Sequence, residues 1–158
     1  DKQESKEETV LLVVLRLSSE WYGVDILKTR EIVLPEKITF LPSAPAFVEG
    51  VINLRGNILA VTNLKKVFGL PAGEVSTGIS SQASSSISSQ TKIVVLQSGV
   101  LETGLLADEV TEIVEVPVKQ IEPPLATLSP EKAAYIQGEC RLANRFIGVL
   151  NVEKILSC

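Results

Sequence analysis

The chain has 158 residues, 45% of them hydrophobic, which is enough to bury a core in one domain or in two small barrels that share an interface. Its 15 Lys and Arg and 19 Asp and Glu give a net charge of −4, which argues against a surface whose main role is to bind phosphates. Two cysteines, a charged amino terminus and the lack of any apolar run of about 18 to 20 residues argue against disulfide-rich secreted and membrane-spanning proteins, so we expect a cytoplasmic protein.

Short segments rich in Val, Ile and Leu follow one another from Thr9 onward and predict β-strands. They read VLLVVLRL, WYGVDIL and REIVLP, with turn-forming residues between them. Within the second and third segments, VDILKTRE is the one place where a short helix competes with a strand. Pro42 and Pro45 in FLPSAPAFVEG favour extended backbone, so this stretch is expected to be an ordered connector.

The central part of the chain predicts a hairpin followed by a helical turn. VEGVINLRG and NILAVTNL form two strands around a Gly-containing turn. In NLKKVFGL, Leu64, Val67 and Phe68 have helical spacing, and Gly69 is a stop signal. Residues 76–90 contain eight Ser and little apolar bulk, which predicts a flexible surface loop and a boundary between two subdomains.

Strand patterns resume beyond this loop in KIVVLQS, LETGLLADEV and TEIVEVP. A helical turn is expected after Pro130, and YIQGECRL and RFIGVLNV predict a hairpin around residues 143–144. VTNLKKVF and VLNVEKIL resemble each other and suggest two related barrels. We expect a flexible segment over residues 1–9, subdomain 1 mainly over 15–75 and subdomain 2 mainly over 91–150, with exchange of strands at their ends left open.

Catalytic and metal-binding groups are scarce. The chain has no His, no CxxC and no glycine-rich phosphate loop, so we predict no enzyme, no cofactor and no metal. One alternative is an enzyme built on Asp108 and Glu112, but ADEVTEIVEV alternates like the solvent face of a strand. A second alternative is an oligonucleotide-binding β-barrel, against which the negative charge argues.

Several longer motifs follow one another in a fixed order: YGVDILKTREI, then FVEGVINLRG and NILAVTNLKKVFG after a Pro-containing connector, and finally ETGLLADEVTEIVEV and YIQGECRLANRFIGVLNVEKIL. Together they resemble the CheW family of chemotaxis coupling proteins. The resemblance covers residues 10–156. The chain departs from the family pattern at Ala60, where Pro is frequent, at Asn63, where Asp is usual, and in its longer Ser-rich insertion. Asn can still cap a helical turn, so the departures do not change the expected fold.

The resemblance implies an all-β fold with two five-stranded SH3-like β-barrel subdomains, packed on a shared hydrophobic core, and one or two short helical turns. It also implies a non-catalytic scaffold that binds the regulatory domain of the histidine kinase CheA and the cytoplasmic tip of a methyl-accepting chemotaxis receptor. Such a protein is recruited to membrane-associated receptor arrays without inserting into the membrane or binding nucleic acid. The alternative is a coupling domain of a larger signalling protein, such as a receiver fusion or a kinase regulatory module.

The resemblance further implies a receptor-binding groove formed by Thr29, Glu31, Gly50, Asn53, Arg55 and Gly56. The planar guanidinium of Arg55 is suited to a carboxylate or helix-end carbonyls of a partner. An internal salt bridge to Glu31 or Glu49 is the alternative. Asn53 and Gly56 are more simply explained by the backbone turn, and Gly50 either admits a partner helix or marks a bulge.

For the kinase, the resemblance indicates an apolar barrel edge. Its candidate residues are Ile32 and Leu34, although core burial is the favoured explanation for at least one of them. Core positions are predicted at Val24, Ile26, Val51, Val61 and Val149.

Overall fold

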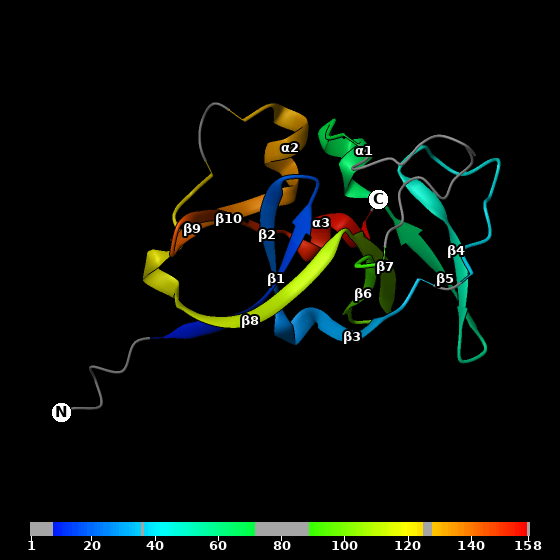
Figure 1. Ribbon diagram of the computed structural model, residues 1–158, viewed down its shortest axis with the longest axis horizontal. Coiled ribbons are helices and arrows are strands. Elements are labelled where there is room, and N and C mark those ends of the chain that lie inside the picture. Colours follow the sequence, from blue (N-terminus) through cyan, green and yellow to red (C-terminus); the bar gives the residue numbers. More distant parts are fainter. Residues whose placement is uncertain (1–7, 36, 72–88, 125–127, 158) are drawn as a thin grey trace.

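The computed structural model describes residues 8–35, 37–71, 89–124 and 128–157, and within them ten strands form two five-stranded sheets (Figure 1). Sheet A has the strand order β8-β1-β2-β10-β9, and sheet B has the order β3-β6-β7-β5-β4. Helices are few and short. The predicted all-β class, with two five-stranded units and a few helical turns, is therefore confirmed.

The strands of sheet A are β1 (Thr9–Leu17), β2 (Glu20–Asp25), β8 (Glu109–Pro117), β9 (Ile136–Leu142) and β10 (Arg145–Leu150). The strands of sheet B are β3 (Thr29–Val33), β4 (Val48–Leu54), β5 (Asn57–Thr62), β6 (Lys92–Ser98) and β7 (Leu101–Ala107). The helices are α1 (Leu64–Phe68), α2 (Pro130–Tyr135) and α3 (Val152–Leu156), and two 3₁₀ turns span Ile26–Lys28 and Val118–Gln120.

The membership of the two sheets corrects the predicted subdomain boundaries. Residues 15–75 and 91–150 do not each form one unit, because β1 and β2 belong with β8, β9 and β10, whereas β6 and β7 belong with β3, β4 and β5. The exchange of strands between the two units thus involves four whole strands, β1, β2, β6 and β7. Four ladders between strands far apart in sequence make this exchange: β1 with β8 and β3 with β6 are antiparallel, and β2 with β10 and β5 with β7 are parallel. Residues 1–7 and 72–88, which include most of the two segments predicted to be flexible, lie outside the described residues.

The two sheets repeat one plan. In each of them, the strand before a short helix pairs in parallel with the second strand of a hairpin. The equivalent pairs in the two ladders are Val61 with Gly104 and Val149 with Gly23. Two residues after each Val comes an Asn, Asn63 or Asn151, whose side chain caps α1 or α3. The similarity between VTNLKKVF and VLNVEKIL therefore corresponds to equivalent structure.

The residues two positions after these capping Asn side chains carry opposite charges. Lys65 in α1 pairs with Asp108, with Nζ 2.7 Å from Oδ1. Glu153 in α3 accepts hydrogen bonds from Lys28 at 2.6 Å and from Ser98 at 2.8 Å. The hydrogen bond from Lys28 is the largest cause that lowers the pKa of Glu153 below its usual value, and the hydrogen bond from Ser98 is the next. Each helix is thus held by a different charge pair.

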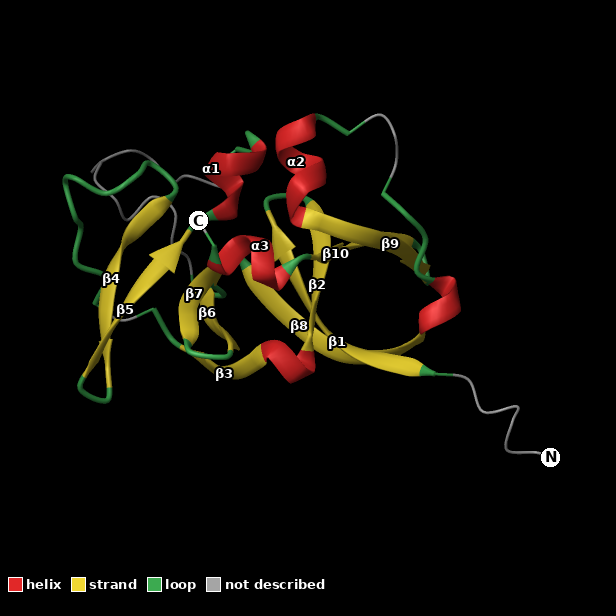
Figure 2. Cartoon of the chain, turned by 180° about the vertical axis from the view of Figure 1, so that it is seen from behind, coloured by secondary structure: helices red, strands yellow, loops and turns green. Residues whose placement is uncertain are grey.

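Three apolar clusters form the core. One lies within sheet A around Leu12 and Val149, and one within sheet B around Val61 and Ile93. The largest is shared, and combines side chains of both sheets with residues of α1 and α3. Figure 2 shows the three helices gathered at the junction of the two sheets, where α1 contacts α2 and α3 packs on β6. The predicted shared hydrophobic core is therefore present.

Most predicted local features are confirmed. The 3₁₀ turn Ile26–Lys28 lies in the segment where helix and strand competed, and α1 ends at Gly69, whose φ of 71° is the left-handed stop expected there. Val24, Val61 and Val149 are buried as predicted. Ile26 and Val51 are only half-buried, because they lie at the margins of the shared core and of sheet B.

Candidate protein-interaction site

The β4–β5 hairpin ends in a two-residue turn made by Arg55 and Gly56. Leu54 pairs with Asn57, and the φ angles of Arg55 and Gly56 are 53° and 88°. Positive φ at both central residues is typical of the type I′ turn, which matches the twist of a hairpin. Oδ1 of Asn53 accepts a hydrogen bond from the Gly56 N–H at 2.9 Å. Asn53 and Gly56 therefore hold the backbone turn that presents Arg55.

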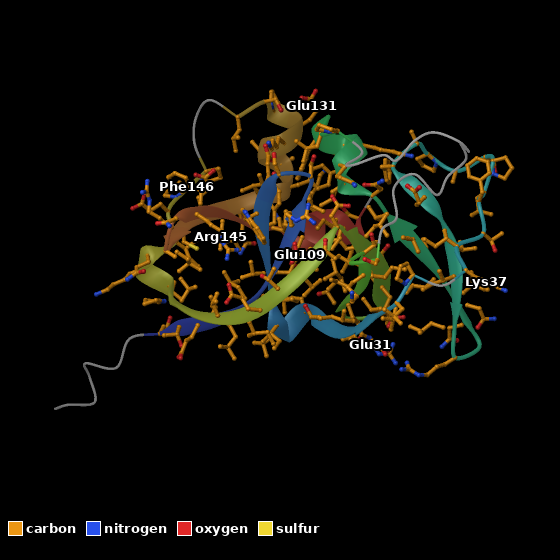
Figure 3. The ribbon with its side chains drawn as sticks, viewed as in Figure 1. Glu31, Lys37, Glu109, Glu131, Arg145 and Phe146 are labelled. Carbon is orange, nitrogen blue, oxygen red and sulfur yellow. The ribbon has the colours of Figure 1, made fainter. Side chains whose placement is uncertain are left out.

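Arg55 forms a two-pronged ion pair with Glu31. Its two terminal nitrogens donate to the two carboxylate oxygens of Glu31 at 2.7 and 2.6 Å. β3 and β4 are opposite edges of sheet B, so this ion pair connects the hairpin tip to the far edge strand. Figure 3 shows Glu31 on the side of the molecule where the hairpin ends, away from Arg145 and Phe146 of sheet A. The internal salt bridge considered for Arg55 is thus present. Glu49 instead accepts a hydrogen bond from Asn63 at 3.0 Å.

The charges around this ion pair favour the ionised form of Glu31. The hydrogen bond from Arg55 is the largest cause that lowers the pKa of Glu31, and the positive charges of Arg55 and Arg30 act in the same direction. The same contact raises the pKa of Arg55. Arg30 also pairs with Glu102 on β7. Beside the hairpin lies a pocket of about 30 Å³, lined in part by Arg30, Arg55 and Glu102, that is large enough only for a water molecule.

The lowered pKa of Glu31 predicts a pH dependence. The stabilisation from this ion pair is present above the unfolded pKa of about 4.5 and is lost as the pH falls through the lower folded value. In an NMR titration we expect the Glu31 carboxyl carbon to shift below pH 4.5, and Arg55→Ala to move that transition upward. Lys37→Ala, which removes an exposed cation, serves as the control. A Glu31 titration unchanged by Arg55→Ala would show that the pair does not form in solution.

Thr29 and Gly50 lie in different surroundings. Thr29 begins β3, on the same strand as Glu31, and its hydroxyl donates to the carbonyl of Asp25 at 3.3 Å. Gly50 is a buried residue of β4. It comes five residues before Arg55, which is about 17 Å along an extended strand. A Cβ at Gly50 would lie 2.3 Å from the carbonyl oxygen of Thr39 in the connector. The chain's own backbone therefore fills the space beside Gly50. The register shift between Val48 and Gly50 is the β-bulge that was the alternative explanation for this glycine.

Ile32 and Leu34 are exposed on and just after edge strand β3. Their exposed fractions are 40% and 60%, so the core burial considered for one of them is wrong. Val33 between them packs into the core of sheet B, as strand alternation requires. Among the described strands, β3 pairs with β6 alone. An exposed apolar edge of this kind is suited to a protein partner.

The carboxylates considered for catalysis have separate structural partners. Asp108 is buried against Lys65, which corrects its assignment to a solvent face, whereas Glu112 is exposed and lies 3.6 Å from Arg145. In the described part of the chain, no three His, Cys, Asp or Glu side chains are placed to hold a metal ion. Within that same part, none of the helices has the length and apolar character needed to cross a membrane.

Two packed β-sheets, an exposed apolar edge and a charged hairpin beside it define a β-rich protein-interaction scaffold. Residues 11–158 match the family model described as the CheW-like domain. The chain therefore belongs to the CheW-like family.

Relatives with known names agree with this assignment. The chain is 30% identical to the chemotaxis protein CheW of Helicobacter pylori, over 98% of this chain and 86% of that protein. It is 29% identical to CheW of Treponema pallidum, over 96% of this chain and 84% of that protein. The crystal structure of the scaffolding protein TtCheW from Thermoanaerobacter tengcongensis superposes with a TM-score of 0.76 at 30% identity, covering 93% of this chain and 87% of that one. The chain is a non-catalytic adaptor of chemotaxis-type signalling.

Proposed function

We propose that this adaptor joins a CheA-type histidine kinase, through its regulatory domain, to the cytoplasmic tip of a methyl-accepting chemotaxis receptor. The observation that carries the proposal is the pairing of two different surfaces around β3. One is the Arg55–Glu31 ion pair at the hairpin tip, and the other is the apolar pair Ile32 and Leu34. A scaffold that joins two proteins needs two such surfaces held on one rigid element.

The receptor surface is centred on Arg55. Two of its nitrogens donate to Glu31, and the side chain remains 63% exposed. A guanidinium has five N–H donors, so Glu31 orients the group while leaving donors for a partner. The carboxylates and helix-end carbonyls of a helical receptor tip are acceptors of the required kind. Thr29 and Glu31 belong to this surface, while Asn53 and Gly56 support it through the turn and Gly50 through the strand.

The kinase surface is the exposed edge of β3. Ile32 and Leu34 offer apolar side chains there, and the edge offers backbone groups for pairing with a strand of a similar β-domain. Binding to a receptor tip would bring the adaptor from the cytoplasm to membrane-associated arrays.

Arg55→Ala tests the receptor surface. We expect the affinity for an isolated receptor signalling tip to fall about tenfold or more, because charge-assisted hydrogen bonds are lost. The affinity for the kinase regulatory domain should not change. Titration calorimetry measures both affinities, and thermal unfolding should remain cooperative because the side chain is largely exposed. Lys37→Ala removes the same charge elsewhere and is the control.

Three results would contradict parts of this proposal. Loss of cooperative unfolding in Arg55→Ala would assign Arg55 a structural role. Unchanged receptor affinity would remove Arg55 from the interface. If the unmodified chain bound neither the receptor tip nor the kinase domain, the coupling function itself would be wrong.

A further inference from the structure

A buried ion pair beside α1 lies at the junction of the two sheets. Lys65 Nζ lies 2.7 Å from Asp108 Oδ1, and the two side chains are 2% and 11% exposed. The other carboxylate oxygen, Oδ2, accepts a hydrogen bond from the backbone N–H of Ser18 at 2.6 Å. Lys65 follows β5 and Asp108 follows β7, both of sheet B, whereas Ser18 lies in the turn between β1 and β2 of sheet A. The two oxygens of Asp108 therefore hold one group from each sheet.

Further polar contacts fix the backbone at the same place. The N–H of Asp108 donates to the carbonyl of Arg16 in β1 at 2.9 Å. The Arg16 side chain donates to Glu109 at 3.0 Å and to the carbonyl of Ser18 at 2.8 Å. All of these bonds lie where the chain passes from β7 of sheet B to β8 of sheet A. This junction is thus determined by bonds with strict distance and angle requirements.

Apart from the hydrogen bonds that Glu153 of α3 accepts from Lys28 and from Ser98 of β6, the rest of the contact between the sheets is mainly apolar. The shared core of Val, Leu and Ile side chains provides stability, but burial of apolar area is non-directional and such cores tolerate repacking. A buried ion pair has the opposite properties. Its desolvation offsets most of its attraction, so it adds little stability over apolar residues of the same size, while its geometry is demanding.

We propose that the Lys65–Asp108 pair, with Ser18, determines the relative orientation of sheets A and B. Without the pair the shared core still forms, but it no longer selects a single angle between the sheets. This inference stands on the contacts of the chain itself and does not depend on which partners the adaptor joins.

The decisive variant is Lys65→Met/Asp108→Leu, which replaces both charges by apolar side chains of similar size. Spin labels at Ile58→Cys in sheet B and Phe146→Cys in sheet A, 68% and 59% exposed, report the angle between the sheets in a Cys158→Ser background. The two labelled strands lie on opposite sides of the molecule (Figures 1 and 3). We expect the distance distribution between the labels to widen about twofold or to split, with a melting temperature within about 5 °C of the parent.

The control is Arg30→Met/Glu102→Leu. This Arg–carboxylate pair joins β3 to β7 within sheet B, so its removal should leave the distribution narrow. A narrow, unshifted distribution in the Lys65→Met/Asp108→Leu variant would overturn the proposal. Failure of that variant to fold would also overturn it, because the pair would then supply stability rather than orientation. Since no partner is present in this measurement, its outcome is separate from that of the binding experiments.

Discussion

Asp108→Ala is expected to destabilise the protein by about 1.5–3 kcal/mol, because it removes the carboxylate that accepts a charge-assisted hydrogen bond from the buried ammonium of Lys65. Lys65 is 2% exposed, so water cannot replace the lost oxygen unless the junction opens. The variant also removes the acceptor of the Ser18 N–H. Urea unfolding followed by the fluorescence of Trp21, the single Trp, measures the change.

Glu109→Ala is the matched control for this variant. Glu109 is the next residue, and it pairs with Arg16 at 3.0 Å while 30% exposed. Because solvent screens this pair, its removal should cost less than about 1 kcal/mol. Equal effects of the two substitutions would show that the Asp108 pair is no more buried in solution than the Glu109 pair.

Gly50→Ala is expected to destabilise the fold by about 2–4 kcal/mol. The new Cβ would lie 2.3 Å from the Thr39 carbonyl oxygen and 2.8 Å from a methyl of Ile38. Thr39 cannot move freely, because it exchanges backbone hydrogen bonds with Val51 at 2.8 and 2.9 Å. The substitution must therefore break this bridge or shift β4, and thermal unfolding measures the loss.

Gly138→Ala provides a comparison at the equivalent position of sheet A. There the closest atom to a Cβ is a side-chain methyl of Ile121 at 2.6 Å, and the Glu122 carbonyl oxygen is 3.0 Å away. A side chain adjusts more easily than backbone, so the loss should be smaller than for Gly50→Ala. If Gly50→Ala were harmless to the fold but abolished receptor binding, Gly50 would be a contact residue after all.

Local features were predictable because their causes lie within a few residues. The helical spacing of Leu64, Val67 and Phe68, followed by Gly69, was enough to predict α1. Asn is a favoured N-cap residue, so its place before this run agrees with the same helix. The turn at Arg55 and Gly56 likewise needs only its own residues. Sheet membership was not predictable, because a parallel ladder such as β2 with β10 has no signature in the intervening sequence.

The candidate site was predictable only in part. Resemblance to a family supplied Arg55 and Glu31, and their chemistry suggested the ion pair that the structure contains. Lys65 was missed because lysine is rarely buried, and its partner Asp108 is 43 positions away in sequence. Gly50 looks the same in sequence whether a partner or the chain's own connector approaches it, so only its neighbour Thr39 decides the matter.

The opposite charges carried by α1 and α3 bear on how a doubled architecture folds correctly. Two equivalent helices could in principle dock in each other's place, giving a compact but mispaired product. Lys65 and Glu153 occupy corresponding positions, so an exchange would bring Glu153 against Asp108 and Lys65 against Lys28. Like charges would then meet at both docking sites, and the repulsion would be strong at the buried site beside Asp108. The charge at this position of each helix therefore favours docking at its own site and disfavours docking at the other.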